Sequence, residues 1–245
     1  MSLESNLHSF PSAEALAEAV ASRWLDAIAA ASQQGVPHRV ALSGGRIATK
    51  FFAAAVAQCR ARGLSWDGVN FFWADERCLP PTDPESNFRT ANELLFSPLD
   101  ISARQIHRLK GEGDPATAAR EASVELLRLA PANAEGQPVL DLVLLGLGED
   151  GHVASLFPGA GAEVWDCQTP FLVIHDSPKP PPVRISLSYA AMVAAKQIWV
   201  LASGAGKEKA LQDSLQPGLA TSLGRVLKLR ADTQIFTDLP ANARR

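Results

Sequence analysis

LDLVLLGLGEDGHVASLFPG, residues 140–159, is the most specific stretch of the chain. It opens as an apolar run in which Asp141 is the only charged residue, as expected of a strand that is covered on both faces. The run then meets glycines at positions 146 and 148, the turn Glu149-Asp150-Gly151-His152 and a predicted short helical turn that Pro158-Gly159 closes. Strands of this buried kind occur in parallel sheets that helices cover on both faces.

Strand and helix patterns alternate on both sides of this stretch. Short apolar runs predict strands, and stripes at helical spacing, such as Leu16, Val20, Trp24 and Ile28, predict helices. The predicted strands are 39–42, 69–73, 140–146, 171–175, 184–187, 197–202 and 233–237, and the predicted helices are 12–35, 47–61, 114–129, 189–195 and 205–215. We therefore predict a single α/β domain over residues 1–245, with a mostly parallel, doubly wound sheet flanked by helices.

The composition indicates a globular protein with no electrostatic reason to bind nucleic acid or an anionic membrane. Of the 245 residues, 47% are hydrophobic and 20% charged, and 23 Lys and Arg against 26 Asp and Glu give a net charge of −3. The first ten residues resemble no secretory signal, and no apolar run approaches the roughly 18 residues that span a bilayer. We expect a cytoplasmic protein whose partner is a small molecule.

No metal-binding or redox motif is present. The sequence has no CxxC pair, HExxH helix or EF-hand loop, so nothing in it requires a metal or another cofactor. A GxSxG nucleophile elbow is also absent. The three cysteines, Cys59, Cys78 and Cys167, lie far apart, and we expect buried, reduced thiols.

Three unusual segments follow predicted strands directly, after residues 42, 73 and 146. In open α/β sheets, ligands bind beyond the carboxyl ends of the strands, where loops lead into helices. We therefore expect the three segments to meet at one site.

The segment after residue 146 carries the candidate proton-transfer group. Histidine is the one side chain whose ordinary pKa, about 6.5, lets it exchange protons near neutral pH. A lone histidine is more often structural, but His152 has Asp150 two residues before it, glycines around it and a central strand behind it. In a turning loop the two side chains share one side, so we predict that His152 and Asp150 are a catalytic pair.

The segment SGGRIATKFF, residues 43–52, joins a strand to a helix through Gly44 and Gly45. Glycines let backbone amides approach a phosphate at a helix N-terminus, where the helix dipole favours negative charge. The adjacent Arg46 strengthens this interpretation, because a guanidinium binds phosphate through two hydrogen bonds. The segment matches neither GxGxxG nor GxxxxGK[ST], so a tight turn without a ligand is the alternative.

Two further segments supply cations. WADERCLPPTDPESNF, residues 73–88, holds Arg77 in an Asp-Glu-Arg triplet that is either a solvated charge cluster or part of a loop shaped by prolines, with Ser86 as a helix cap. PKPPPVRISLS, residues 178–188, holds Lys179 in a stiff proline run and Arg184 at a strand start, which suits phosphate binding or a plain linker. Lys207, in GAGKEKAL, is expected to be solvated.

These four segments, in this order, resemble the 6-phosphogluconolactonase family, which shares its fold with glucosamine-6-phosphate deaminases. The resemblance runs from about residue 40 to 210 and is strongest in WADERCLPPTDPESN and LGLGEDGHVASLFPG. Both families carry a DGH segment, but the deaminases typically continue it with a run similar to IAFNEPG, whereas this chain has VASLFPG. The resemblance therefore favours the lactonases.

The resemblance implies hydrolysis of 6-phospho-D-glucono-1,5-lactone in the oxidative pentose phosphate pathway. His152 would be the general base on water and Asp150 would orient its ring, while Arg77 or loop amides would stabilise the oxyanion. The implied phosphate ligands are Gly44, Gly45, Arg46, Lys179 and Arg184. No cofactor is implied, and the expected state is a monomer or a small homo-oligomer.

One departure from the family pattern concerns the phosphate site. Lactonases usually follow the glycine pair with a Ser-Thr-Pro-like run, where this chain has Arg46-Ile47-Ala48. Our hypothesis is that Arg46 replaces hydroxyl contacts with a charged one. Two other functions stay open, namely a glucosamine-6-phosphate deaminase or isomerase, which would release ammonia or form a ketose, and a non-catalytic sugar-phosphate sensor.

Overall fold

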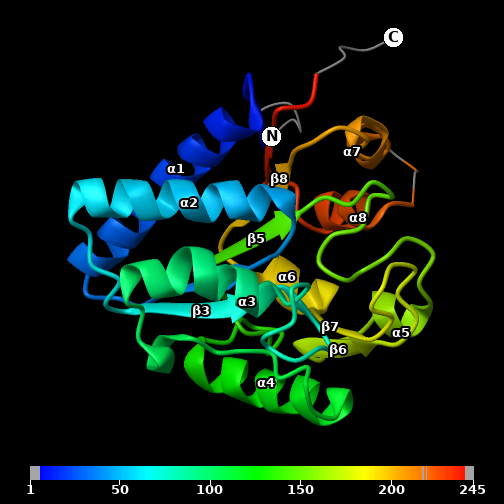
Figure 1. Ribbon diagram of the computed structural model, residues 1–245. Helices are drawn as coiled ribbons and strands as arrows, with labels where there is room; N and C mark the ends of the chain where they lie inside the picture. Colours follow the sequence, from blue (N-terminus) through cyan, green and yellow to red (C-terminus); the bar gives the residue numbers. More distant parts are fainter. Residues whose placement is uncertain (1–5, 217, 219, 241–245) are drawn as a thin grey trace.

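The computed structural model describes residues 6–216, 218 and 220–240, and its centre is a six-stranded parallel sheet in the order β1-β9-β8-β5-β2-β3 (Figure 1). The strands are β1 (Leu7–Ser9), β2 (His38–Leu42), β3 (Val69–Trp73), β5 (Leu142–Gly146), β8 (Ile198–Ala202) and β9 (Gln234–Thr237). Every neighbouring pair is parallel. The predicted α/β class with a mostly parallel sheet is confirmed.

A second, three-stranded antiparallel sheet lies beside the first, in the order β4-β7-β6. Its strands are β4 (Asp75–Arg77), β6 (Phe171–Ile174) and β7 (Arg184–Leu187). Strand β4 was not predicted, because three charged residues have no strand pattern of their own. Its pairing with β7 places Arg77 directly opposite Arg184, although the two are far apart in the sequence.

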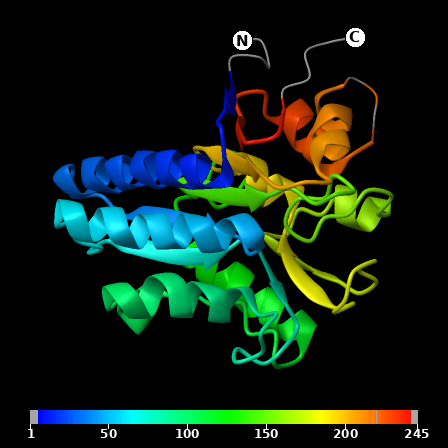
Figure 2. The same ribbon diagram turned by 45° about the horizontal axis from the view of Figure 1, so that its top comes forward.

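The helices cover both faces of the large sheet. They are α1 (Ala13–Gln33), α2 (Arg46–Arg62), α3 (Asn87–Ala91), α4 (Pro115–Leu129), α5 (Ala162–Trp165), α6 (Tyr189–Ala194), α7 (Glu208–Leu215) and α8 (Ser222–Leu229), with a π-helical turn at Asn92–Phe96 and 3-10 turns at Ser97–Leu99 and Ala103–Gln105. Helices α1 and α2 lie side by side on one face (Figure 2). Ser86 caps α3 as predicted, and Ser12 and Asp114 cap α1 and α4, whereas α5 and α8 were not predicted.

Aromatic packing between α1, α2 and the sheet fixes the strand-to-helix turn that the site uses. The predicted α1 stripe is buried, and the Trp24 ring packs at 5.3 Å from the Phe51 ring of α2 and 5.2 Å from that of Trp66. Burial of apolar area, at about 25 cal/mol per Å², holds these elements together. Helix α2 therefore begins at the carboxyl end of β2, with Gly45 as its cap.

The cysteines are less buried than predicted. All three are free, but Cys59 alone is buried, whereas Cys78 and Cys167 are partly exposed. Burial and the neighbouring Glu76 raise the pKa of the Cys78 thiol to about 11, which leaves it protonated at neutral pH. Within the described residues, no helix is long and apolar enough to cross a membrane.

Candidate active site

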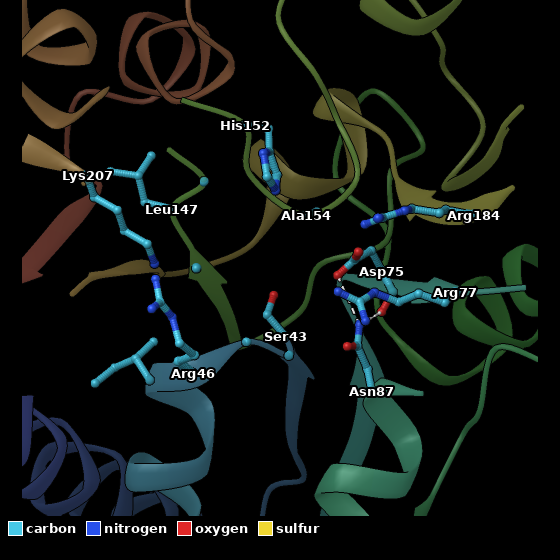
Figure 3. A pocket seen from close by; sticks show the side chains of 15 residues that line it. Ser43, Arg46, Asp75, Arg77, Asn87, Leu147, His152, Ala154, Arg184 and Lys207 are labelled. Carbon is cyan, nitrogen blue, oxygen red and sulfur yellow. Dashed lines mark hydrogen bonds between the residues drawn. The ribbon is translucent and has the colours of Figure 1, made fainter. Parts of the chain in front are cut away.

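A pocket of about 500 Å³ opens where β2, β3 and β5 end (Figure 3). These three strands are neighbours in the sheet, so the loops that follow them meet, as the sequence predicted. The lining residues are Ser43, Gly44, Gly45, Arg46, Ile47, Asp75, Arg77, Asn87, Gly146, Leu147, Gly148, His152, Ala154, Arg184 and Lys207. Of the predicted site residues, Asp150 and Lys179 lie outside this lining.

His152 and Asp150 form a close pair at the edge of the pocket. The Nδ1 atom of His152 lies 2.5 Å from Oδ1 of Asp150, and the ring packs against Phe157 with centroids 4.5 Å apart. An ionised carboxylate only accepts hydrogen bonds, so Nδ1 donates and Nε2 keeps the lone pair. The imidazole is therefore set up to take a proton at Nε2.

The charge state of Asp150 favours this arrangement. Burial opposes its ionisation, but the hydrogen bond and charge of His152, together with Lys179, hold the pKa of the carboxyl well below its usual range. The ammonium of Lys179 lies 3.8 Å from Oδ1 of Asp150. Lys179 thus contacts the Asp150–His152 pair, and it does not line the pocket as the phosphate interpretation requires.

Glycines shape the loop that carries this pair. A Cβ atom at Gly148 would lie 2.0 Å from Nδ1 of His152 and 2.7 Å from Oδ1 of Asp150, so a side chain there would displace both. Gly151 has φ +84°, a left-handed conformation that glycine adopts without strain. The predicted helical turn at this point is wrong, since Val153 and Leu156 close a tight bridged turn with Ala154 at φ +50°.

Arg184 is held by the proline loop that precedes it. The side chain is 3% exposed, and its guanidinium donates to the carbonyls of Lys179 (3.0 Å), Pro180 (3.0 Å) and Pro181 (3.1 Å). Burial lowers the pKa of Arg184, and the charge of Arg77 adds to the effect. The carbonyl groups of this loop therefore hold Arg184 at the pocket. The side chain of Lys179, in the same loop, lies beside Asp150 instead.

A buried polar group that the sequence analysis missed completes this side of the pocket. Asp75 is 4% exposed, and its Oδ2 accepts a hydrogen bond from Ser155 Oγ at 2.6 Å. Asn87 donates from Nδ2 to the carbonyl (2.9 Å) and Oδ1 (3.4 Å) of Asp75. A Cβ at Gly44 would lie 2.0 Å from Asn87 Oδ1, so this glycine makes room for the asparagine.

The solvated interpretation of the Asp-Glu-Arg triplet is wrong. Glu76 is 4% exposed, and its carboxylate accepts from Ser86 Oγ and from the backbone N–H groups of Asn87 and Phe88. Burial raises the pKa of Glu76, while these backbone hydrogen bonds oppose the rise. The carboxylate ties the start of α3 to β4 and so positions Asn87.

Two cations come together on the other side of the pocket. Figure 3 shows the ends of Arg46 and Lys207 directed toward each other, across the pocket from Asp75 and Arg184. Lys207 is 9% exposed, so the prediction of a solvated lysine is wrong. The loop before it is folded inward, because Asp238 accepts from Ser203 Oγ (3.0 Å) and from Gly204 N (3.3 Å).

Burial and nearby charges shift the pKa of Lys207 and give Arg46 an acidic partner. Burial lowers the pKa of Lys207 and the nearby Arg46 lowers it further, whereas Glu149 and Asp238 oppose the shift. Arg46 is more exposed, and its Nη2 lies 3.7 Å from Oε1 of Glu149. The pocket thus contains four cationic side chains and suits an anionic ligand. Among the described residues, no three His, Cys, Asp or Glu side chains gather as a metal site.

Comparison with known proteins agrees with this geometry. The model of the glucosamine-6-phosphate isomerase/6-phosphogluconolactonase family matches residues 11–224. The chain belongs to this family. A 6-phosphogluconolactonase from Streptomyces coelicolor is 35% identical over 208 residues, which cover 82% of this chain and 79% of that protein. The chain is accordingly an enzyme of the hydrolase side of the family.

Solved structures of the family have the same fold. The 6-phosphogluconolactonase of Trypanosoma brucei superposes with a TM-score of 0.80 at 27% identity, covering 95% of this chain and 94% of that one. A monomeric glucosamine-6-phosphate deaminase, at 19% identity and a TM-score of 0.81 over 98% of this chain and 100% of that one, shows the shared fold alone.

Proposed function

We propose that this chain hydrolyses 6-phospho-D-glucono-1,5-lactone to 6-phosphogluconate in the oxidative pentose phosphate pathway, as a single domain. The observation that carries the proposal is the Asp150–His152 pair at the edge of a pocket lined by four cations. A phosphorylated sugar lactone needs both features, because its ester carbonyl needs an activated water and its phosphate needs positive charge.

In this reaction His152 acts twice. Its Nε2 takes a proton from water while the water oxygen attacks the lactone carbonyl, and the tetrahedral oxyanion forms. When the intermediate collapses, the bond to the ring oxygen breaks and the imidazolium returns the proton to that oxygen as it becomes a hydroxyl group. General base catalysis of this kind contributes about 10²–10⁴-fold, and Asp150 stabilises the imidazolium between the two steps.

The rest of the pocket binds and orients the substrate. The amides of Gly44 and Gly45 at the start of α2, with Arg46 and Lys207, bind the phosphate from one side of the pocket, and Arg184 faces it from the other side (Figure 3). Arg77 or loop amides stabilise the oxyanion. The Asp75 carboxylate lines the pocket and is held in place by Ser155 and Asn87, which positions it to accept a hydrogen bond from a sugar hydroxyl group. Binding the distant phosphate positions the reacting carbonyl.

The first test compares wild type with His152→Ala on freshly generated lactone, coupled to 6-phosphogluconate dehydrogenase. The lactone hydrolyses spontaneously, so only acceleration above the enzyme-free rate counts. We expect kcat to fall by about 10²–10⁴-fold with KM nearly unchanged. Wild type that merely matches the spontaneous rate contradicts the function, and a variant that keeps its kcat removes His152 from the chemistry. An ammonia-release assay with glucosamine 6-phosphate tests the deaminase alternative.

Arg184→Ala is expected to act on binding instead. Loss of a charge-assisted contact to the phosphate raises KM by about tenfold to a hundredfold, with a much smaller change in kcat. The same kinetic assay checks this, with circular dichroism to confirm that the variant is folded, since the guanidinium also binds three carbonyl groups. A KM that stays at the wild-type value contradicts a role for Arg184 in phosphate binding.

A further inference from the structure

One acidic side chain is placed where the two converging cations meet solvent. Arg46 is the first residue of α2, and Glu149 lies on the catalytic loop, immediately before Asp150. Their ion pair, 3.7 Å between Nη2 and Oε1, links the helix that begins the phosphate site to the loop that carries His152. Lys207 stands beside them, and within the described part of the chain its ammonium makes no hydrogen bond or ion pair.

The Arg46–Glu149 ion pair is weak because solvent surrounds both side chains. The two side chains are 75% and 60% exposed, and at 3.7 Å the contact is longer than a charge-assisted hydrogen bond. A phosphate ester near neutral pH carries close to two negative charges and offers three acceptor oxygens, against one charge for a carboxylate. A phosphate group between Arg46 and Lys207 therefore outcompetes Glu149 for the guanidinium.

We infer that Glu149 is an exchangeable counter-ion, which holds Arg46 in the free enzyme and gives it up to the phosphate of the substrate. The inference rests on the proposed function for the identity of that substrate. Glu149 then lowers the affinity of the site for phosphorylated ligands, and it should not affect a sugar lactone without phosphate, which does not compete for the guanidinium. Arg46 and Glu149 in this way set the affinity of the proposed phosphate site.

The test is a double-mutant cycle on product binding, which needs no turnover. Calorimetry measures the Kd of 6-phosphogluconate for wild type, Arg46→Ala, Glu149→Gln and the double variant, with gluconate as the ligand that lacks phosphate. We expect Arg46→Ala to raise the Kd by about tenfold, and Glu149→Gln to lower it by about threefold. In the Arg46→Ala background, the second substitution should change the Kd by less than about 1.5-fold.

A matched control comes from the same helix. Lys50 of α2 pairs with Glu14 of α1, and both side chains are exposed, but neither residue lines the pocket. Lys50→Ala removes one positive charge from α2, as Arg46→Ala does, and should leave the Kd of 6-phosphogluconate within about 1.5-fold of wild type at physiological salt. A larger change would mean that the helix charge, and not the Arg46 contact, governs binding.

Two results overturn the inference. If Glu149→Gln tightens binding equally with and without Arg46, Glu149 acts by general repulsion and not by occupying the guanidinium. If Arg46→Ala leaves the Kd unchanged, Arg46 does not bind the phosphate. Inorganic phosphate as a third ligand separates the inference from the proposed function. If Arg46 and Glu149 are coupled in phosphate binding but the enzyme does not hydrolyse the lactone, the counter-ion role of Glu149 stands and the proposed reaction is refuted.

Discussion

Two histidines, at opposite ends of the neighbouring strands β2 and β5, differ in whether their surroundings let them exchange a proton. His38 begins β2, is 6% exposed, and accepts a hydrogen bond at Nε2 from the Trp24 indole at 3.2 Å. His152 follows β5 at the carboxyl edge, where Nδ1 meets a carboxylate and the ring lines the pocket. Burial lowers the pKa of His38 to about 4, so its imidazole stays neutral at neutral pH.

A third histidine shows that a carboxylate partner alone does not leave a ring nitrogen free to accept a proton. His107 pairs with Glu125 at 2.9 Å through Nδ1, but its Nε2 is also occupied, 3.1 Å from Asn70 Oδ1, and the ring stacks on Phe72. The feature that distinguishes His152 is therefore a carboxylate on one nitrogen together with a second nitrogen left for the pocket. The surroundings of each histidine, and not the residue type, therefore separate His152 from His38 and His107.

After His152→Ala, the largest effect should follow from removing the carboxylate of the Asp150–His152 pair. Asp150→Asn keeps the shape but offers an amide in place of a charge, so the imidazolium formed during the reaction loses its stabilisation. We expect kcat to fall on the order of 10²–10³-fold, with KM changed by less than about threefold. Steady-state kinetics with the coupled assay measures both.

The control for this substitution is Asp26→Asn, which removes an exposed carboxylate that pairs with Arg62 at 2.7 Å, far from the pocket. It should leave kcat at the wild-type value, because exposed ion pairs contribute little. Equal losses in the two variants, or a drop confined to KM in Asp150→Asn, would show that Asp150 does not act through His152.

A somewhat smaller loss of kcat is expected from a substitution that changes the shape of the loop around Asp150 and His152 without changing its charges. The added Cβ in Gly148→Ala meets Nδ1 of His152 at 2.0 Å, which forces the ring out of its position. We predict a fall in kcat on the order of 10-fold to 10²-fold, because small misplacements of catalytic groups are costly. Gly113→Ala, whose added Cβ meets its nearest atom at 3.7 Å, is the matched control and should keep full activity.

The elements near the site could be predicted where one continuous segment of the sequence contains all the residues that define them. The run of residues 142–146 is apolar on both faces and is followed by the loop that carries Asp150 and His152, so both the strand and the loop could be inferred from it. His152 stood out because Asp150 is its neighbour in sequence as well as in space. The Gly44–Gly45 turn was predictable for the same reason, since a strand, two glycines and a helix follow one another.

Residues that depend on contacts between distant segments were missed. Lys207 looks like an exposed residue before a helix, and it is buried because Asp238, from beyond β9, draws its loop inward. Asp75 lies opposite Ser186 because β4 pairs with β7, and Ser155, whose backbone N–H donates to Ser186 Oγ, reaches the Asp75 carboxylate. Lys179 was assigned to the phosphate because the sequence does not tell whether a stiff loop presents its side chain or its carbonyl groups.

The smallest effect on activity, and a clear one on stability, is expected at His38. Its folded pKa, about 4, lies below the unfolded value of 6.5, mainly because of burial, with Lys196 and Arg39 reinforcing the shift and Asp141 opposing it. Between these pH values the unfolded chain binds more protons than the folded one. Protonation therefore stabilises the unfolded state, and the free energy of unfolding falls as the pH drops from 6.5 toward 4, by about 3 kcal/mol in total.

His38→Gln isolates this contribution, because a glutamine oxygen still accepts the hydrogen bond from Trp24 but has no proton to gain. Urea unfolding of both proteins at several pH values between 7 and 4 should show that the free energy of unfolding falls less steeply on acidification in the variant than in wild type. The kcat of the variant at pH 7.5 should equal that of wild type. Parallel plots of the free energy of unfolding against pH would mean that folding leaves the pKa of His38 at its ordinary value. The contrast with His152 would then need another basis, because a buried imidazole without a carboxylate partner would also exchange its proton.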